Sequence, residues 1–399
     1  PLRSSAASDV YKRQLLASYG TGPMKKNWSA AFAVGKRWGD SGFQEGTFYD
    51  AQPLFVAVEK QWSNHSLNAT VIATPNRRGK SSPNTQEAYD LKGTKYNEYW
   101  GWQDGHLRNS RVRRTFEPIF QLNHKWALSS STTLYTNIGF QFGEVGNSRL
   151  DYPGGANPSP AYYQKLPSYF LTQNAGPDYE GAYRYTQKFK QQGQLDWNSL
   201  YDANLTNNIN SLPAAYVLYE DRNDDTQLSL QTKLQTEVSD KITLVGLLQH
   251  RSFSSHNFAQ LTDMLGATYY LNVDPYDGFQ YDLNSPNSKL GVGDKMRYHY
   301  ALKANISEAT LLTQFNTPKI SGYVGGNYVL THYQRDGKFK HEAYPKSSYG
   351  KSKKQSFISG NLKTGLTYKI TGKHLLQANA ALLNRAPSLR NSFSNPRET

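Results

Sequence analysis

The chain has 399 residues, no cysteine and a formal net charge of +14, and its mean hydropathy is −0.72. The absence of cysteine excludes disulfides and thiolate metal sites, and no stretch approaches the roughly 18 consecutive apolar residues that a membrane-spanning helix needs. The basic residues are scattered through loops and no helical motif collects them, so the charge favours an acidic ligand or anionic lipopolysaccharide over nucleic acid.

The N-terminal segment is set aside before the fold is considered. Residues 4–14, SSAASDVYKRQ, read as the in-frame translation of a sequencing adaptor, and we exclude residues 1–14 on that ground. No linker or shift of composition divides residues 15–399. This predicts one large architecture instead of several compact domains.

The first predicted strand, residues 28–38, alternates between two faces with a period of two. Its ten steps at about 3.3 Å each, tilted by about 40°, rise roughly 25 Å, which is the height of the apolar band of outer-membrane barrels. Trp28 and Trp38 stand at its two ends, where an aromatic girdle is expected, and Trp62 and Trp126 end later strands in the same way.

Ten further segments show the same alternation, which gives eleven predicted strands. The ten segments are residues 54–62, 67–73, 120–126, 134–142, 226–234, 242–248, 296–302, 320–330, 358–368 and 376–382. One face of each segment is apolar. The other face of the sixth strand carries Gln227, Ser229, Gln231, Lys233 and Gln235, which predicts a polar lumen.

The connections between these segments alternate between short and long. The short connections are residues 63–66, 128–131, 238–241 and 371–374, with a longer exception at 306–317, and the long connections are residues 39–52, 75–114, 143–225, 252–293 and 334–354. A propeller or sandwich has no reason to place its long loops at every second connection. The sequence therefore predicts an all-β fold, a transmembrane antiparallel β-barrel with short periplasmic turns and long extracellular loops.

The odd number of predicted strands suggests an incomplete barrel. If the first strand rises from the periplasm, the eleventh ends outside the cell, whereas single-chain bacterial barrels have even strand numbers. The signal peptide that export requires is also missing. We therefore expect a piece of a larger barrel whose two terminal strands would be unpaired edges.

Two of the loops are long enough to be functional, namely residues 75–114 and 143–225. Aromatic and arginine side chains usually carry recognition energy, although the same residues also pack loops against each other. The candidate ligand contacts are Tyr99, Trp100, Trp102, Arg108, Tyr162 and Tyr163. Residues 196–205 predict a short helix capped by Asp196 that braces the longer loop.

Catalytic motifs are weak, and we expect no enzymatic activity, no metal site and no cofactor. His341 opens a possible HExxH motif, but Pro345 stands where its second histidine is required. Neither GxSxG nor a phosphate-binding loop is present. His124, His250 and Asp294 would form a hydrolase site only if barrel closure brought them together.

The run NRAPSLRNSFSNPRE at residues 384–398 resembles the late-barrel segment of TonB-dependent outer-membrane receptors, especially the branch with a carboxypeptidase-regulatory-like domain before the plug. The stretches RWGDSGFQEGTFYDAQPLFVAVEK, TPNRRGKSSPNTQEAYDL and DYPGGANPSPAYYQKLPSYF are similar to loops and strands of the same branch. This resemblance covers nearly all of residues 15–399. It rests on extended similarity and not on one diagnostic motif.

The resemblance implies a barrel of about 22 strands closed by an N-terminal plug, with uptake powered through the TonB complex. Eleven strands are about half of that number, and the plug, the TonB box and the final strands would lie outside this sequence. We expect active import of a scarce, bulky ligand, such as a siderophore, an oligosaccharide or a peptide, across a Gram-negative outer membrane. A surface lipoprotein is a further candidate partner, besides membrane lipid and lipopolysaccharide.

Two other functions remain open at this point. A passive porin would have the same wall but an open lumen, and a surface adhesion or structural barrel would use its loops to bind a partner protein. Uptake that collapses when the proton gradient is dissipated would separate the importer from both alternatives.

Overall fold

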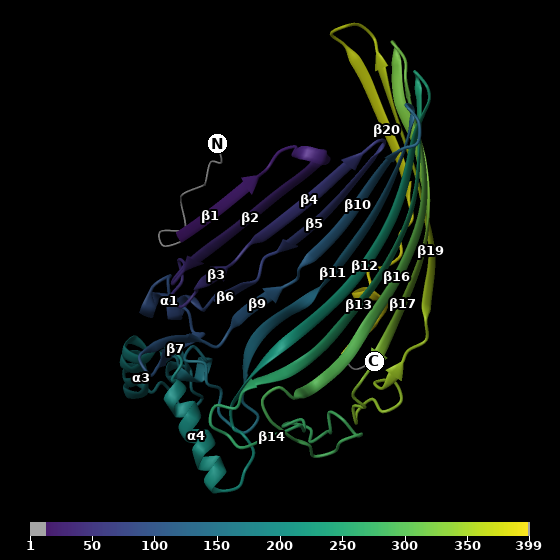
Figure 1. Ribbon diagram of the computed structural model, residues 1–399. Helices are drawn as coiled ribbons and strands as arrows, with labels where there is room; N and C mark the ends of the chain where they lie inside the picture. The colour runs from purple at the N-terminus through teal and green to yellow at the C-terminus, as the bar shows by residue number, and fades with distance from the viewer. Residues whose placement is uncertain (1–12, 398–399) are drawn as a thin grey trace.

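Figure 1 shows the computed structural model, which describes residues 13–397. Long antiparallel strands form one curved, open sheet, and helices and short strands gather beyond one end of it. The segment set aside as an adaptor lies outside the described residues except for Arg13 and Gln14, which begin the first strand.

Twelve long strands cross the sheet, which contains sixteen strands among the described residues. The long strands are β1 (Arg13–Gly20), β2 (Trp28–Gly39), β4 (Leu54–Trp62), β5 (His65–Ala73), β10 (Ile119–Ala127), β11 (Thr132–Asp151), β12 (Val217–Ser239), β13 (Ile242–Asp263), β16 (Lys295–Asn316), β17 (Ile320–Gly337), β19 (Gln355–Lys369) and β20 (Leu375–Leu383). The short strands of the sheet are β3 (Tyr49–Ala51), β6 (Asn76–Gly79), β9 (Val112–Phe116) and β18 (Gly350–Lys351).

The other elements belong to the connections. Two small ribbons pair β7 (Trp100–Gln103) with β8 (His106–Asn109) and β14 (Tyr270–Leu271) with β15 (Lys289–Leu290). The helices are α1 (Gln86–Lys92), α2 (Pro167–Leu171), α3 (Tyr179–Gln192) and α4 (Trp197–Ile209), with 3-10 turns η1 (Lys25–Asn27), η2 (Tyr163–Lys165) and η3 (Arg390–Ser392). None of the helices within residues 13–397 is long and apolar enough to span a bilayer.

Strand register places apolar side chains in continuous rows on one face of the sheet. β11 and β12 pair without a shift, so that Ile138 lies opposite Leu230. These two side chains are 39% and 41% exposed, and a monomeric soluble protein rarely exposes so large an apolar face. On the opposite face, Asn137 Nδ2 donates a hydrogen bond to Gln231 Oε1 at 3.0 Å. The sheet therefore has the apolar outer wall and polar inner wall of a membrane barrel.

The predicted fold class is thus confirmed, with all eleven predicted strands present in the described residues. The predicted faces are also correct for β11 and β12, because a period of two puts alternate side chains on opposite walls. Within residues 13–397, β1 and β20 each have a neighbour on one side only.

One long strand, β1, was not predicted. It pairs with β2 from Arg13 opposite Trp38 to Gly20 opposite Ala31. Part of it had been set aside with the adaptor, and its apolar residues do not alternate. The described chain therefore has one long strand more than the eleven predicted, and the argument from an odd strand number does not apply to it.

The predicted longer exception at residues 306–317 was wrong, because β16 continues to Asn316 and only a short turn precedes β17. Adjacent leucines at 311 and 312 point to opposite faces and hid the alternation. The strands also extend further toward the loops than predicted. β11 ends at Asp151 and β12 begins at Val217, so that the longest connection is shorter than residues 143–225.

The helix predicted after Asp196 is present as α4, and the Asp196 carboxylate caps it by accepting a hydrogen bond from the Ser199 backbone N–H. The longer α3 was not predicted. Its N-terminus is capped in the same way by Asp178, whose carboxylate accepts from Gly181 N at 2.8 Å.

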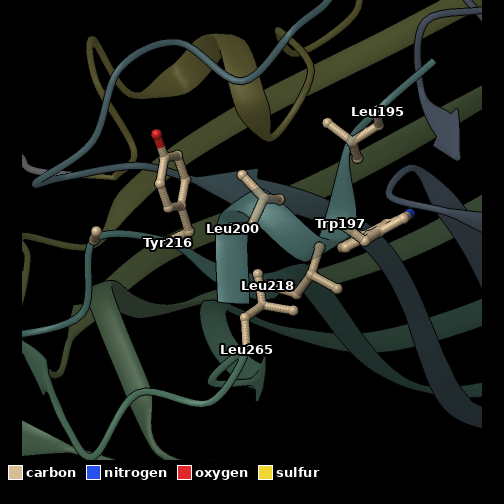
Figure 2. Packing of buried hydrophobic residues seen from close by; sticks show 7 residues of the cluster. Leu195, Trp197, Leu200, Tyr216, Leu218 and Leu265 are labelled. Atoms are coloured by element: carbon tan, nitrogen blue, oxygen red, sulfur yellow. The ribbon is translucent and has the colours of Figure 1, made fainter. Parts of the chain in front are cut away.

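The connections at the helical end have their own hydrophobic core, which Figure 2 shows. Trp197, fully buried, and Leu200 come from α4 and pack with Leu218 of β12 and Leu265 of the connection after β13. A second core around Met296 joins β12, β13 and β16. These cores fix the long connection between β11 and β12 on the strand ends.

Candidate functional site

The two long connections, which the structure limits to residues 80–111 and 152–216, pack into one layer beyond the strand ends (Figure 1). The backbone N–H of Leu195 donates to the Trp100 carbonyl at 2.9 Å, and Trp197 Nε1 donates to the Arg108 carbonyl at 3.2 Å. The predicted contacts on the β7–β8 ribbon therefore lie beside the start of α4.

Arg108, a predicted ligand contact, is used inside this layer. Its Nη2 atom forms an ion pair with Asp263 Oδ2 at 2.5 Å, and its guanidinium lies 4.2 Å from the centre of the Trp197 ring. It also donates to Gln103 Oε1 at 2.6 Å. These contacts make Arg108 a brace between β7–β8, α4 and the end of β13.

We expect Arg108→Ala to loosen the loop layer by roughly 1–3 kcal/mol, because it removes a partly buried ion pair and a cation–π contact. Hydrogen exchange of α4 and the β7–β8 ribbon in the intact protein measures this effect. Lys95→Ala is the matched control, since Lys95 is an exposed cation of the same connection. Equal exchange in both variants would contradict the bracing role.

The tryptophans of β7 differ in exposure. Trp100 is 7% exposed and Trp102 is 60% exposed, and their rings meet edge to face with centroids 5.6 Å apart. Tyr99 is half-buried, with the Arg111 guanidinium 5.2 Å above its ring. Trp102 is thus the member of this group with a large surface open to a ligand.

Tyr162 and Tyr163 lie in a separate group at η2. Their rings are 4.8 Å apart, and Tyr163 also meets the ring of Tyr169 at 5.7 Å. Tyr163 is 58% exposed. The structure therefore gathers Trp100, Trp102 and Arg108 on the β7–β8 ribbon and places the tyrosine pair on another part of the layer.

A cavity of about 560 Å³ opens beside Trp102, between α3, α4 and the segment before η2. Tyr185, Lys165 and Lys188 line it together with amide and hydroxyl side chains such as Gln192. Burial, and then the nearby charge of Lys188, lowers the pKa of Lys165.

A basic cluster faces the polar side of the sheet at the same end, and the sequence did not reveal it as a cluster. Its members come from β6, β9, β11 and the residues next to them. They are Arg78, Lys80, Arg111, Arg113 and Arg149. Arg78 lies opposite Arg113, and Arg113 lies opposite Asn147 of β11. Asn147 shares its face with Asn137 and not with Ile138, so the cluster lies on the inner wall, well beyond the apolar band.

Lys80 shows how strongly positive this surface is. Its Nζ donates to Asn147 Oδ1 at 2.5 Å. Burial is the largest cause that lowers its pKa, followed by the charges of Arg113, Arg149, Arg78 and Arg111. The contribution of these four positive charges, unlike that of burial, also favours a bound anion.

Counter-charges neutralise only part of the cluster. Arg149 Nε forms an ion pair with Asp221 Oδ2 at 2.5 Å, and Asp221 also accepts a hydrogen bond from the Tyr298 hydroxyl at 2.6 Å. No ion pair involves Arg78 or Arg113 in the part of the chain that the structure describes. These two arginines can therefore take an anionic ligand.

The predicted girdle tryptophans lie at strand ends. Trp28, Trp62 and Trp126 are 43%, 40% and 36% exposed and stand near the short turns. His65 stacks between Trp62 and Trp126, with centroid distances of 5.4 and 5.2 Å. Trp38 is half-buried near the other end of β2. This arrangement suits an interfacial aromatic belt.

The three residues weighed for a hydrolase have separate partners. His124 Nε2 lies 3.0 Å from His65 Nδ1, and His250 Nδ1 lies 2.9 Å from Ser307 Oγ. Asp294 accepts a hydrogen bond from a backbone N–H of its own loop. Within residues 13–397 no group of three or more metal-binding side chains is assembled.

Comparisons with solved structures agree with the curved antiparallel sheet described above. No protein-family model matches the sequence, and no curated protein matches it. Solved structures do match. The ferric citrate transporter FecA has a TM-score of 0.59 and 7% identity over 93% of this chain and 41% of its own. The ferric-catecholate import receptor Fiu from E. coli K12 has a TM-score of 0.57 and 10% identity over 95% of this chain and 54% of its own.

The siderophore receptor PiuA from Acinetobacter baumannii gives a TM-score of 0.52 and 10% identity over 92% of this chain and 46% of its own. The resemblance to TonB-dependent outer-membrane receptors is thus confirmed at the level of the fold. The chain spans about half the length of these receptors and transporters.

Proposed function

We propose that this chain forms part of an outer-membrane receptor that imports a scarce, bulky and anionic ferric chelate by TonB-dependent transport. The observation that carries this proposal is the basic cluster on the inner wall at the loop end, with Arg78 and Arg113 free of ion pairs among the described residues. Arginine suits carboxylate and other planar anionic groups because its guanidinium donates in a fixed fork.

The fold supports this function. Ferric citrate, ferric catecholates and siderophores are the ligands in the names of the solved structures that the chain resembles, and iron chelates built from carboxylates or catecholates carry negative charge. The exposed apolar face of the strands supports placement in the outer membrane. The TonB complex and membrane lipid would be its partners, with a surface lipoprotein as a further candidate.

A second candidate ligand is an oligosaccharide, because the cavity beside Trp102 offers the chemistry for one. The indole ring is 60% exposed, and amide and hydroxyl side chains such as Gln191, Gln192 and Ser199 line the same space. Such groups both donate and accept hydrogen bonds, as hydroxyl-rich ligands require. A peptide is the third class that the sequence suggested.

Uptake by cells that carry the intact protein tests the proposal. Ferric citrate and a ferric catecholate with radiolabelled iron, a labelled oligosaccharide and a labelled peptide are supplied in parallel, with and without an uncoupler of the proton gradient. We expect uptake of a ferric chelate that stops when the gradient is dissipated. Uptake that is indifferent to the uncoupler would establish a porin, and energy-dependent uptake of the oligosaccharide alone would replace the ligand class.

A further inference from the structure

Three side chains of the inner wall converge on one carboxylate, that of Asp221 in β12. Arg149 Nε forms an ion pair with Asp221 Oδ2 at 2.5 Å, and the Tyr298 hydroxyl donates a hydrogen bond to Oδ1 at 2.6 Å. Arg397 Nη2 lies 3.8 Å from the same Oδ1 atom. Asp221 lies opposite Asn147 in register, so this carboxylate is on the inner wall, next to the basic cluster.

The carboxylate is largely covered, whereas the two arginines around it remain accessible. The Asp221 side chain is 16% exposed, and the side chains of Arg149 and Arg397 are 46% and 55% exposed. A guanidinium that contacts one carboxylate presents further N–H groups to a second anionic group. Asp221 therefore holds, from within the protein, the two arginines that an anion on the inner wall could contact.

Arg397 comes from the segment that follows β20, residues 384–397. This segment packs against the sheet, since the Tyr333 hydroxyl of β17 donates to the Pro387 carbonyl at 3.2 Å. The Arg397 guanidinium lies 4.4 Å from the centre of the Tyr298 ring. The same tyrosine thus holds Asp221 through its hydroxyl and Arg397 through its ring, which fixes the two charged groups relative to each other.

A buried cation, Arg335 of β17, fixes the backbone on either side of this contact. It is 2% exposed, and none of the ion pairs among the described residues includes it. Its Nε donates to the Pro396 carbonyl at 2.7 Å, its Nη2 to the Arg397 carbonyl at 3.1 Å and its Nη1 to the Ser348 carbonyl at 2.9 Å. The forked guanidinium is therefore used to position the chain that carries Arg397.

We propose that Asp221 is a built-in competitor of the anionic ligand, and that Arg397 is a further ligand contact beside Arg149. An anionic oxygen of the ferric chelate replaces the Asp221 carboxylate on the two arginines, while the Tyr298 hydroxyl keeps Asp221 in place. Because the ligand has to displace a carboxylate, it binds less tightly and dissociates faster than it would from the same arginines alone. Asp221 thus sets the affinity of the site, which lets an importer release its ligand.

This inference rests on the proposed function, and Asp221→Asn in the intact protein tests it. Asparagine keeps the shape of the side chain and an acceptor for the Tyr298 hydroxyl, but it removes the charge. We expect the variant to bind ferric citrate about tenfold more tightly than the wild type, mainly through slower dissociation. Equilibrium titration and dissociation rates measure the gain. A residue with a merely structural role would not strengthen binding when it is replaced.

Asp202→Asn is the matched control, because it changes the net charge equally at an exposed position of α4. It should leave the dissociation rate unchanged. The double variant Asp221→Asn and Arg397→Gln should lose most of the gain, since one of the two freed arginines is then absent. Arg335→Lys keeps the buried charge but not the fork. It should weaken binding as Arg397→Gln does, and it should add nothing to that variant.

Two results would overturn the inference while the proposed function stands. If the wild type binds ferric citrate and Asp221→Asn binds it equally or more weakly, Asp221 does not compete with the ligand. If the gain persists in full with Arg397→Gln, Arg397 is not a ligand contact. The proposed function fails in a different way, namely when neither the wild type nor Asp221→Asn binds ferric citrate or a ferric catecholate, and this inference then fails with it.

Discussion

Replacing Arg78 and Arg113 by glutamate in the intact protein should lower its affinity for an anionic ferric chelate by about a hundredfold or more, because close charge pairs contribute several kcal/mol and the new charges repel the ligand. The two guanidiniums lie opposite each other in register and have no ion pair among the described residues. Equilibrium binding at low and high salt measures the loss, and the wild-type affinity should fall with salt while that of the variant changes little.

A control with the same change of net charge separates the site from general attraction. The control is the double variant Arg184→Glu and Lys190→Glu. Both residues are exposed on α3, away from the inner wall. They should slow ligand association slightly and leave the dissociation rate unchanged. If both double variants lose affinity equally, the ligand responds to the net charge of the protein, and the basic cluster is not its site.

Most strands could be predicted because apolar and polar residues alternate along each of them, with the apolar residues on the outer wall and the polar residues on the inner wall. β12 shows this alternation clearly. Leu228, Leu230 and Leu234 lie on one wall, and Gln227 and Gln231 lie on the other. Both walls can therefore be identified from this strand without knowledge of its partner strands. The alternation is absent in β1, and adjacent apolar residues mask it around residues 311 and 312 of β16, so neither segment could be assigned correctly from the sequence.

The basic cluster could not be predicted in the same way. Arg78 and Arg113 are separated by a connection with its own helix and ribbon, and Arg149 comes from a part of β11 that the sequence assigned to a loop. Only the register of β6, β9 and β11 puts these charges side by side. The runs NRRGK and RVRRT show that the charges exist but not that they converge.

The sequence could not show which of the predicted loop contacts are free to bind a ligand, because aromatic and arginine side chains also pack loops against each other. Arg108 and Trp100 stabilise the loop layer. Arg108 does so through an ion pair and a cation–π contact, and Trp100 is buried in the layer. Trp102 and Tyr163 kept exposed surfaces of 60% and 58%. The exposed fraction of a side chain depends on how the whole loop layer packs. It therefore distinguishes ligand candidates from packing residues, although both kinds look alike in the sequence.

The membrane placement proposed for the sheet predicts the second large effect, which follows when a charge is introduced on the outer wall. Ile138 lies six residues beyond Thr132, the first residue of β11, or roughly 15 Å above the short turn and near the middle of the apolar band. We expect Ile138→Arg to destabilise the folded protein by about 2–4 kcal/mol in a bilayer, because its charge must enter hydrocarbon. Urea titration of the intact protein in lipid vesicles measures this loss.

Asn137→Arg is the control for this prediction, since Asn137 is the neighbouring residue at nearly the same depth but faces the inner wall. It loses the hydrogen bond to Gln231, which costs about 1 kcal/mol, and its charge stays in contact with water. The difference between the two variants therefore measures the cost of the lipid environment itself. Equal stabilities would mean that the apolar face of the sheet does not contact lipid, and they would remove the physical basis for the proposed importer.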